Sequence, residues 1–490
     1  MLPTLSADAL ILAVDVGSSS VRAMLFDRNG HALDNVFAQV KYSPQTTHDG
    51  GSMIDPDALC EMVFDSISTA LQQAGNRTSQ ITVVAMDTLV STILGVGEDG
   101  KPTTPIFTWA DTRGGDLSDV WCSRLADAGL SSAQYTQITG CRIHTSYWPL
   151  RLMWLEAQSP DAFQRTAYWM SVGEYLYYFL TGTRQVSLST ASWSGSLNRH
   201  TLEWDSQVLA ALRLRREQLS AISSQPQKSK GDEWSRRWPT LRAALWTPSV
   251  ADGVASNIGA GCTTPNHVAL SVGTSGALRV VVPGAPDTVP DGLFAYRVDE
   301  KRSLIGGALS NAGNLYAWMQ RILKIDDAET LEHLIAGMEP DSHGLTVLPF
   351  LAGERAPGWN SAAQAVIMGM TLDTAPEQLV RAGLEAIAYR FSQVADRLAP
   401  LLPTDPIYVA SGTAILSSPT WMQILADTLN ATVCATTDHE TTIRGTVYLA
   451  TGNELSPQLG HCYTPDPIRY AIYMKAKERQ IALYKRLFQS

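Results

Sequence analysis

An apolar run that ends in a loop of glycine and serine is the feature that most constrains the fold. Residues 10–16 read Leu-Ile-Leu-Ala-Val-Asp-Val, which predicts a buried strand. Gly17 and three serines follow, and residues 21–27 alternate as a second strand. The turn signal at residues 27–30 then predicts a third strand through Val40. The segment therefore predicts three consecutive strands with a polar loop after the first.

The same pattern occurs once more, in the second half of the chain. Residues 267–273 form an apolar run into Gly273, a Thr-Ser-Gly loop follows, and residues 277–283 are apolar again. A repeated unit predicts two domains of related α/β design. A chain of 490 residues is also too long for a single core. We place the boundary at residue 250, which gives domains of residues 1–250 and 251–490.

Charge and composition exclude several classes of protein. The net charge of −10 argues against a nucleic-acid partner, because binding a phosphate backbone needs a basic surface. No apolar stretch approaches the ~18 residues of a membrane span, and the N-terminus lacks the basic segment of a signal peptide. We therefore expect a cytoplasmic protein with no membrane partner, and a homodimer stays open as its assembly. The six cysteines, none in a C-x-x-C motif, are expected to be reduced thiols.

The two polar loops have the chemistry of phosphate binding. Glycine lets the backbone approach an anion, and successive N–H groups and hydroxyls can hold its oxygens. Asp15 beside the first loop could hold Mg²⁺, which prefers few carboxylates together with phosphate and water. A hairpin with a polar tip explains one such loop equally well, but two in different halves favour two jaws that close on one polyphosphate. Neither loop resembles G-x-x-x-x-G-K-[ST], so a P-loop NTPase is not expected.

Two further segments carry candidate catalytic and binding residues. Asp252, beside Gly253 at the proposed boundary, could accept a proton from a hydroxyl, although taken alone it is better explained as a turn residue that caps the next helix. Trp109, Asp111 and Arg113 combine an aromatic platform with charged hydrogen-bonding groups, as a polyol site requires. A salt bridge beside a core tryptophan is an equally good explanation of that motif.

These motifs, in this order, resemble the FGGY carbohydrate kinases, a branch of the actin-like ATPase superfamily. The resemblance covers nearly the whole chain. Its elements are the loop after Asp15, the Trp-x-Asp-x-Arg motif at 109–113, Pro-x-Arg-Leu-x-Trp-Leu at 149–155, Ala-Asp-Gly at 251–253, Ser-x-Gly-Thr-Ser-Gly at 271–276, Gly-Glu-Arg-x-Pro at 353–357 and the signature at 411–427.

The resemblance implies an α/β fold of two ribonuclease-H-like domains with a ligand cleft between them. It implies an enzyme that uses ATP and Mg²⁺ to phosphorylate a sugar, with the sugar mainly on residues 1–250 and ATP mainly on residues 251–490. Asp252 would be the catalytic base and Asp15 the metal ligand. The implied ATP and phosphate residues are Gly17, Ser18, Ser19, Arg22, Gly273, Thr274, Ser275, Gly313, Ser411, Gly412 and Thr413. The implied substrate residues are Asp87, Thr88, Trp109, Asp111, Arg113, Arg142, His144 and Asp252.

Departures from the family pattern bear on the substrate. Arg22 and Arg151 stand where the family often has lysine, and Asp87-Thr88 stands where xylulose kinases usually carry Met-His, which argues against xylulose. Residues 108–113, 139–144 and 353–357 look closer to gluconate kinases, so D-gluconate is the first expectation and a ketopentose such as xylulose or ribulose the second. Two other classes are a nucleotide-driven actin-like switch and an inactive sugar-binding regulator. The sugar motif argues against the former, and the retained Asp15 and Asp252 argue against the latter.

Overall fold

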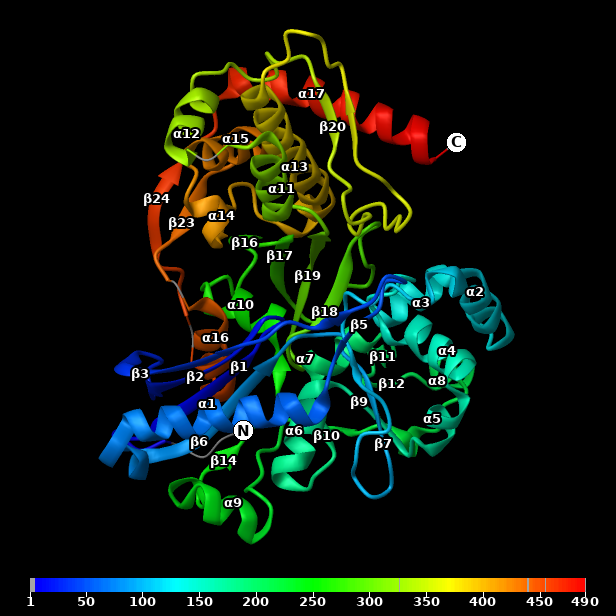
Figure 1. The fold of residues 1–490 in the computed structure, drawn as a ribbon, viewed down its shortest axis with the longest axis vertical. Coiled ribbons are helices and arrows are strands. Elements are labelled where there is room, and N and C mark those ends of the chain that lie inside the picture. Colours follow the sequence, from blue (N-terminus) through cyan, green and yellow to red (C-terminus); the bar gives the residue numbers. More distant parts are fainter. Residues whose placement is uncertain (1–4, 326, 439, 454, 490) are drawn as a thin grey trace.

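The fold is built on two β-sheets that lie one above the other in Figure 1. The structure is a computed structural model, and it describes residues 5–325, 327–438, 440–453 and 455–489. Within those ranges, no helix combines the length and the apolar character that crossing a bilayer requires.

The N-terminal sheet has the strand order β14-β6-β1-β2-β3, with β15 beside β6. β1 and β2 form the hairpin predicted from the first polar loop, β3 continues it antiparallel, and β6 joins the other side of β1 in parallel. β1 is buried along its whole length, as its unbroken apolar run predicts. The strands of this sheet are β1 (Leu10–Val16), β2 (Ser20–Asp27), β3 (Ala32–Lys41), β6 (Ile81–Thr88), β14 (Leu245–Trp246) and β15 (Val250–Ala251).

The C-terminal sheet repeats this design. Its order is β18-β19-β17-β16-β22-β23-β24, so an antiparallel hairpin on one side of β16 again meets parallel strands on the other side. The repeated pattern in the sequence therefore corresponds to a repeated sheet, and the α/β prediction is confirmed. The strands are β16 (His267–Val272), β17 (Gly276–Pro283), β18 (Phe294–Arg297), β19 (Arg302–Leu309), β22 (Ile407–Ser411), β23 (Val433–Thr436) and β24 (Leu459–Tyr463).

Two helices lie between the sheets and pack against each other (Figure 1). They are α10 (Asp252–Gly259), which begins directly after β15, and α16 (Thr441–Thr451), which packs on β1 and β6. Their backbones approach closely because both contain glycine at the crossing. A Cβ atom at Gly445 would lie 1.8 Å from the carbonyl oxygen of Ala255, and one at Gly259 would lie 1.7 Å from that of Thr441. Through this crossing, a segment of the C-terminal half supports the N-terminal sheet.

Other helices cover the outer faces of the sheets. α1 (Pro56–Ala74) begins at an Asp55 cap and packs on β2 and β3. α13 packs against β17 and β19 on the C-terminal sheet, with α15 and α17 beside it. The other helices that lie outside the lobe described next are α9 (Gly231–Arg237), α11 (Gly313–Leu323), α12 (Ala328–Ala336), α13 (Pro376–Leu398), α14 (Thr413–Leu416), α15 (Pro419–Leu429) and α17 (Pro467–Phe488).

A large insertion between β6 and β14 forms the helical lobe at the right of Figure 1. It has its own apolar core, in which Trp121, Tyr135, Trp148 and Trp169 are buried. Its helices are α2 (Ser118–Asp127), α3 (Ser132–Thr139), α4 (Trp148–Gln158), α5 (Pro160–Arg165), α7 (Leu188–Ala191) and α8 (Ser206–Leu212). The insertion also contains α6 (Val172–Thr181), which packs into the core of the N-terminal sheet. The remaining short strands are β4 (Gln45–Thr46), β5 (Ser52–Ile54), β7 (Leu94–Val96), β8 (Ile106–Phe107), β9 (Tyr168–Met170), β10 (Gln185–Val186), β11 (Leu197–Asn198), β12 (Glu203–Trp204), β13 (Ala221–Ile222), β20 (Thr346–Leu348) and β21 (Val366–Met368).

The expectation that all six cysteines are reduced thiols is wrong for two of them. Cys434 and Cys462 form a disulfide across a sequence separation of 28 residues. They stand directly opposite each other on the antiparallel strands β23 and β24, a pairing that brings the sulfurs together and that no local motif indicates. The other four cysteines are free thiols.

Candidate active site

Three carboxylates meet at the carboxyl ends of adjacent parallel strands in the N-terminal sheet. Asp15 at the end of β1 is the register partner of Asp87 at the end of β6. β15 pairs with this same end of β6, and Asp252 follows β15 as the first residue of α10. Because parallel strands end at the same edge of a sheet, residues far apart in sequence converge here, as ligand-binding residues do in other α/β folds. Sheet register therefore brings the predicted base and the predicted metal ligand together.

Asp87 is the most enclosed of the three carboxylates, and its contact with the sugar stays a prediction. Its side chain is fully buried, and its Oδ2 accepts a hydrogen bond of 2.5 Å from the hydroxyl of Thr446 on α16. Burial and then the charge of Asp15 raise the pKa of Asp87 well above the ordinary value. This environment favours the neutral form of Asp87, and its bond to Thr446 ties α16 to the sheet. Its neighbour Thr88 is also buried, with its hydroxyl 3.0 Å from that of Ser249.

Asp252 has the environment of a general base. Burial raises its pKa to about 7, and the nearby charge of Asp15 adds to the rise. Arg279 on β17, together with hydrogen bonds from backbone amides, opposes the rise. One of these bonds, from the amide of Gly253, is 2.7 Å long. A carboxylate with a pKa near neutrality can both accept and release a proton at working pH.

Asp15 lies beside the first polar loop and is paired with a cation. Arg22 on β2 forms ion pairs with Asp15 and with Glu440, which comes from the C-terminal half of the chain. A nearly buried carboxylate next to a phosphate-binding loop, with two more carboxylates close by, is a donor set of hard oxygens that suits Mg²⁺. The residues present therefore fit the predicted metal, with Arg22 neutralising part of the local negative charge.

The two hairpin loops have similar tight turns. The amide of Gly17 donates to the carbonyl oxygen of Ser20 over 3.0 Å, and the amide of Gly273 donates to that of Ser275 over the same distance. Ser18, Ser19 and Thr274 are exposed, which leaves their hydroxyls available to a ligand. The first loop is supported by a residue that the sequence did not single out, because the hydroxyl of Tyr42 donates to the carbonyl oxygen of Gly17 over 2.5 Å.

Gly313 supports the second loop from behind. Its amide donates to the carbonyl oxygen of Gly273 over 3.0 Å, and the next amide, of Asn314, donates to that of Thr274. A Cβ atom at Gly313 would lie 2.4 Å from the carbonyl oxygen of Gly273. Because its N–H group donates to Gly273, Gly313 positions the loop, and its contact with ATP stays a prediction.

A third loop lies next to the second one. Ser411 ends β22 and is the register partner of Ser271 on β16. Gly412 has a φ of 106°, and a Cβ atom there would lie 2.2 Å from the carbonyl oxygen of Val272. Thr413 is exposed at the start of α14. The predicted adenine loop thus abuts the predicted phosphate loop, and Gly412 permits that contact.

Asp111 and Arg113 form a closed ion pair. The side chain of Arg113 donates to Asp111 over 3.1 Å through Nε and over 2.6 Å through Nη2. The carboxylate also accepts from the amide of Ser52, and the guanidinium stacks on Trp154 at 4.1 Å. The carboxylate of Asp111 therefore neutralises the charge of Arg113.

Trp109 lies against the C-terminal half. The guanidinium of Arg355 is stacked over the Trp109 ring at 5.0 Å. The Nη2 of Arg355 donates to the carbonyl oxygen of Leu309 over 2.9 Å. Within the described residues, the Nε of Arg355 has no hydrogen-bond partner. Trp109 and Arg355 therefore bring an aromatic face and an incompletely bonded cation together from the two halves of the chain.

The structure directs Arg142 away from these groups. Its guanidinium donates to the carbonyl oxygens of Leu293 and Pro290 over 3.0 and 2.9 Å, and it contacts Asp291 at 3.3 Å. These bonds fix Arg142 in the wall of a separate cavity, described below.

His144 is a neutral side chain in this structure. Burial lowers its pKa to about 3, and the charges of Arg355 and Arg151 lower it further. Its Nδ1 lies 2.9 Å from the hydroxyl of Ser146. His144 can hydrogen-bond a substrate but does not offer a positive charge.

Besides Tyr42, sequence reasoning missed four residues of the site: Arg279, Thr446, Glu440 and Arg355. A single arginine within the apolar strand 277–283 was a readable signal for Arg279, and Arg355 was part of a quoted motif without an assigned role. Thr446 and Glu440 reach the N-terminal sheet only because α16 packs on it, and nothing in their local sequence indicates this.

Comparison with known proteins agrees with this geometry. Two sequence models match the chain, the FGGY family of carbohydrate kinases, N-terminal domain, over residues 10–230 and the C-terminal domain of the same family over residues 268–452. The chain is 25% identical to a gluconokinase of Bacillus subtilis (strain 168), over 94% of this chain and 92% of the relative.

Solved structures agree over nearly the full length. The gluconate kinase of Lactobacillus acidophilus superposes with a TM-score of 0.88 at 25% identity, with 98% of each chain covered. The ligand-bound xylulose kinase of the same organism gives the same TM-score, identity and coverage. The expected pair of actin-like ATPase domains is confirmed. The chain belongs to the FGGY family of carbohydrate kinases.

Proposed function

We propose that this carbohydrate kinase transfers the γ-phosphoryl group of ATP to the terminal hydroxyl of D-gluconate. The observation that carries the transfer is the placement of Asp252, a carboxylate with a pKa of about 7 at the first turn of the helix between the two sheets. The gluconokinase and gluconate kinase among the similar proteins support the choice of sugar.

Asp252 acts on the attacking hydroxyl. As the hydroxyl oxygen bonds to the γ-phosphorus, the bond from phosphorus to the β–γ bridging oxygen breaks and ADP leaves. The hydroxyl proton passes to Asp252. Little other covalent chemistry is required of the protein, because phosphoryl transfer depends mainly on alignment and on stabilising charge.

The three loops hold ATP. In our proposal, the amides and hydroxyls of residues 18–19 and 274–275 donate to phosphate oxygens, and residues 411–413 border the adenine. Gly17 and Gly273, whose amides close the two turns, let the backbone approach the phosphates. Asp15 would hold Mg²⁺, which when bound neutralises charge on the phosphates. Residues 1–250 would then bind mainly the sugar and residues 251–490 mainly the nucleotide.

The carboxylate of gluconate needs a cation, and the structure changes which one we propose. Arg113 is neutralised by Asp111, Arg142 lies in another cavity, and His144 is neutral. Arg355 is left as the best candidate, because it stacks on Trp109 and its Nε is unbonded within the described residues. A charge-assisted bond from Arg355 would both bind and orient an aldonate.

A ketopentose is the second candidate substrate. The ligand-bound xylulose kinase matches the chain as well as the gluconate kinase does, at a TM-score of 0.88 and 25% identity. The two candidates differ at one chemical group, since gluconate has a carboxylate and xylulose does not.

Initial rates of ADP release with D-gluconate, D-xylulose and D-ribulose test the proposal. We expect kcat/KM to be highest for D-gluconate, and Arg355→Gln to lower it by about 10–100-fold, as loss of a charge-assisted hydrogen bond does. The same variant should change the kcat/KM of the ketopentoses by less than about threefold. A wild-type enzyme that turns over D-xylulose faster than D-gluconate would overturn the aldonate assignment and support the second candidate.

A further inference from the structure

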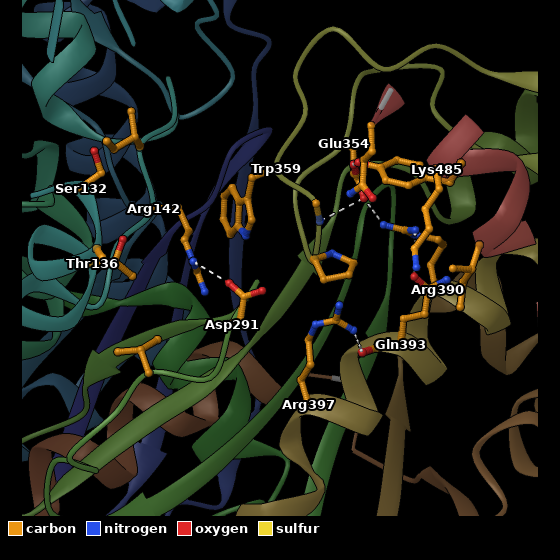
Figure 2. Close-up of a pocket in the computed structure, with 18 of the residues that line it drawn as sticks. Ser132, Thr136, Arg142, Asp291, Glu354, Trp359, Arg390, Gln393, Arg397 and Lys485 are labelled. Carbon is orange, nitrogen blue, oxygen red and sulfur yellow. Dashed lines mark hydrogen bonds and ion pairs between the residues drawn. The ribbon is translucent and has the colours of Figure 1, made fainter. Parts of the chain in front are cut away.

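A cavity opens between the helical lobe and the C-terminal helices. Its volume is about 620 Å³, which is within the range of small-molecule sites. Ser132, Thr136 and Arg142 come from the N-terminal half and form one side, and residues of α13 and α17 form the other side (Figure 2). Asp15, Asp87, Asp252 and the three loops do not occur among the described residues that line it.

The lining carries more positive than negative charge. Four cationic side chains, Arg142, Arg390, Arg397 and Lys485, face two carboxylates, so the cavity has an excess of two positive charges. The chain as a whole has a net charge of −10, which makes this local excess notable. A concave site lined by one sign of charge concentrates ligands of the other sign.

The two carboxylates do not cancel this charge within the cavity. Glu354 is already used, because its Oε1 pairs with Arg390 and accepts from the amide of Gly358, while its Oε2 accepts from Tyr484 over 2.5 Å. Asp291 contacts Arg142 at 3.3 Å, but its side chain is 95% exposed. An ion pair so open to water contributes little, so Asp291 can give way to a bound anion.

Arg397 has no ion-pair partner among the described residues, and its charge repels two neighbouring arginines. Arg397 donates to the carbonyl oxygen of Gln393 over 2.7 Å, but no ion pair to its guanidinium occurs among the described residues. Its charge disfavours the charged forms of both Arg142 and Arg390, whose pKa values are lowered first by burial. The Nε of Arg390 is buried without a hydrogen-bond partner in the described part of the chain. An anion among these groups would relieve the repulsion and supply the missing acceptors.

The rest of the lining suits a hydroxylated ligand. Ser132 and Thr136 present hydroxyls on α3, and the Trp359 ring provides an aromatic face beside Arg142 (Figure 2). From this combination of cations, hydroxyls and an aromatic face, we propose that the cavity is a second binding site, separate from the active site, for a small phosphorylated sugar or polyol. The phosphate would bind among Arg142, Arg397 and Lys485, since guanidinium groups make paired bonds to phosphate.

Such a ligand would connect the two sides of the cavity. In the cavity lining, the side chain of Gln137 on α3 already bonds to the backbone of Val289. Its Oε1 accepts from the Val289 amide over 2.7 Å, and its Nε2 donates to the Val289 carbonyl oxygen over 3.3 Å. A ligand that reaches from Arg142 to Arg397 would add a link between the segment that follows α3 and α13. A bound ligand would thereby favour the relative position of the two halves in which both sides of the cavity contact the ligand.

Calorimetric titration with D-glucose 6-phosphate tests the proposal, with the nucleotide loops first saturated by a non-hydrolysable ATP analogue. We expect the wild type and Asp252→Asn to bind the probe with equal affinity. Replacing both Arg397 and Lys485 by glutamine should weaken binding by at least about tenfold, because two charge-assisted contacts are lost. The conservative Arg397→Lys variant should stay within about threefold of wild type.

Lys475→Gln is the matched control, because Lys475 is exposed on the same helix as Lys485 and does not line the cavity. It should leave probe affinity unchanged. Retained binding of the ATP analogue shows that each variant is folded. Lys485 lies at an exposed position, and Lys485→Gln alone should still lower the affinity for the probe by about threefold. The proposal is overturned if the wild type does not bind the probe at millimolar concentration. It is equally overturned if the double variant binds as tightly as the wild type, or if Asp252→Asn abolishes binding.

Discussion

At the scale of single residues, the environment gives three neighbouring carboxylates three different states. Asp87 is buried and its pKa is raised, Asp15 is paired with Arg22, and Asp252 has a pKa of about 7. Carboxylates whose surroundings differ in this way take different chemical roles. This difference assigns the base to Asp252 and a supporting role to Asp87.

The pH dependence of catalysis should report the pKa of Asp252. The base must be ionised, and its pKa is raised, so activity is present above pH 7 and is lost as the pH falls through about 7. Arg279→Gln removes a positive charge that lowers this pKa, and it should move the acidic limb of kcat/KM upward by about one pH unit. An acidic limb that does not move in Arg279→Gln would argue against Asp252 as the titrating group.

Asp87→Asn should stabilise the protein increasingly as the pH rises. A raised pKa in the folded state means that the stability contributed by protonated Asp87 is full at low pH and declines above its unfolded pKa. Asparagine cannot ionise, and its amide oxygen can still accept from Thr446. The melting temperature of the variant relative to wild type should therefore be higher at pH 8 than at pH 5 by at least about 1 °C. A difference that is independent of pH would show that Asp87 does not hold its proton.

At the scale of elements, the crossing of α10 and α16 positions the site. α10 begins with Asp252, and α16 provides Thr446 to Asp87. The crossing depends on the absence of a side chain at Gly445 and Gly259, whose Cβ positions are occupied by backbone carbonyl oxygens. The close packing of these two helices is therefore a condition for the geometry of the carboxylates.

Gly445→Ala should separate these helices and lower both stability and activity. The added Cβ would lie 1.8 Å from the carbonyl oxygen of Ala255, and overpacking of this kind costs about 1–3 kcal/mol. Gly337→Ala is the control, because its nearest contact would be 3.7 Å away and its φ is −75°. Denaturant unfolding of both variants checks this, and equal stability of Gly445→Ala and wild type would contradict it.

At the scale of the whole molecule, the sequence was most informative where structure is local. The strand–loop–strand units around Gly17 and Gly273 could be predicted because apolar runs and turn residues lie next to each other in the chain. The ends of helices are local in the same way. Ser418 caps α15 by accepting from the amide of Trp421, and Gln378 accepts from the amide of Ala375 at the start of α13.

The features that were not predictable depend on packing between distant segments. The disulfide requires the register of β23 and β24, and the direction of Arg142 is set by carbonyl groups about 150 residues away. The carbonyl oxygen that excludes a Cβ at Gly445 comes from a helix that is distant in the sequence, and the hydroxyl that holds Asp87 comes from the other half of the chain. No pattern in one short stretch contains that information.

The central claim is that phosphoryl transfer requires proton acceptance by Asp252, and steady-state kinetics of Asp252→Asn with D-gluconate and ATP measures this most directly. We predict that kcat falls by about 10²–10⁴-fold, as loss of a positioned general base does, while the KM for ATP changes by less than about threefold and the melting temperature is retained. Asp87→Asn, measured alongside, should keep kcat within about tenfold of wild type. A near-normal kcat in Asp252→Asn, together with loss of activity in Asp87→Asn, would contradict the account.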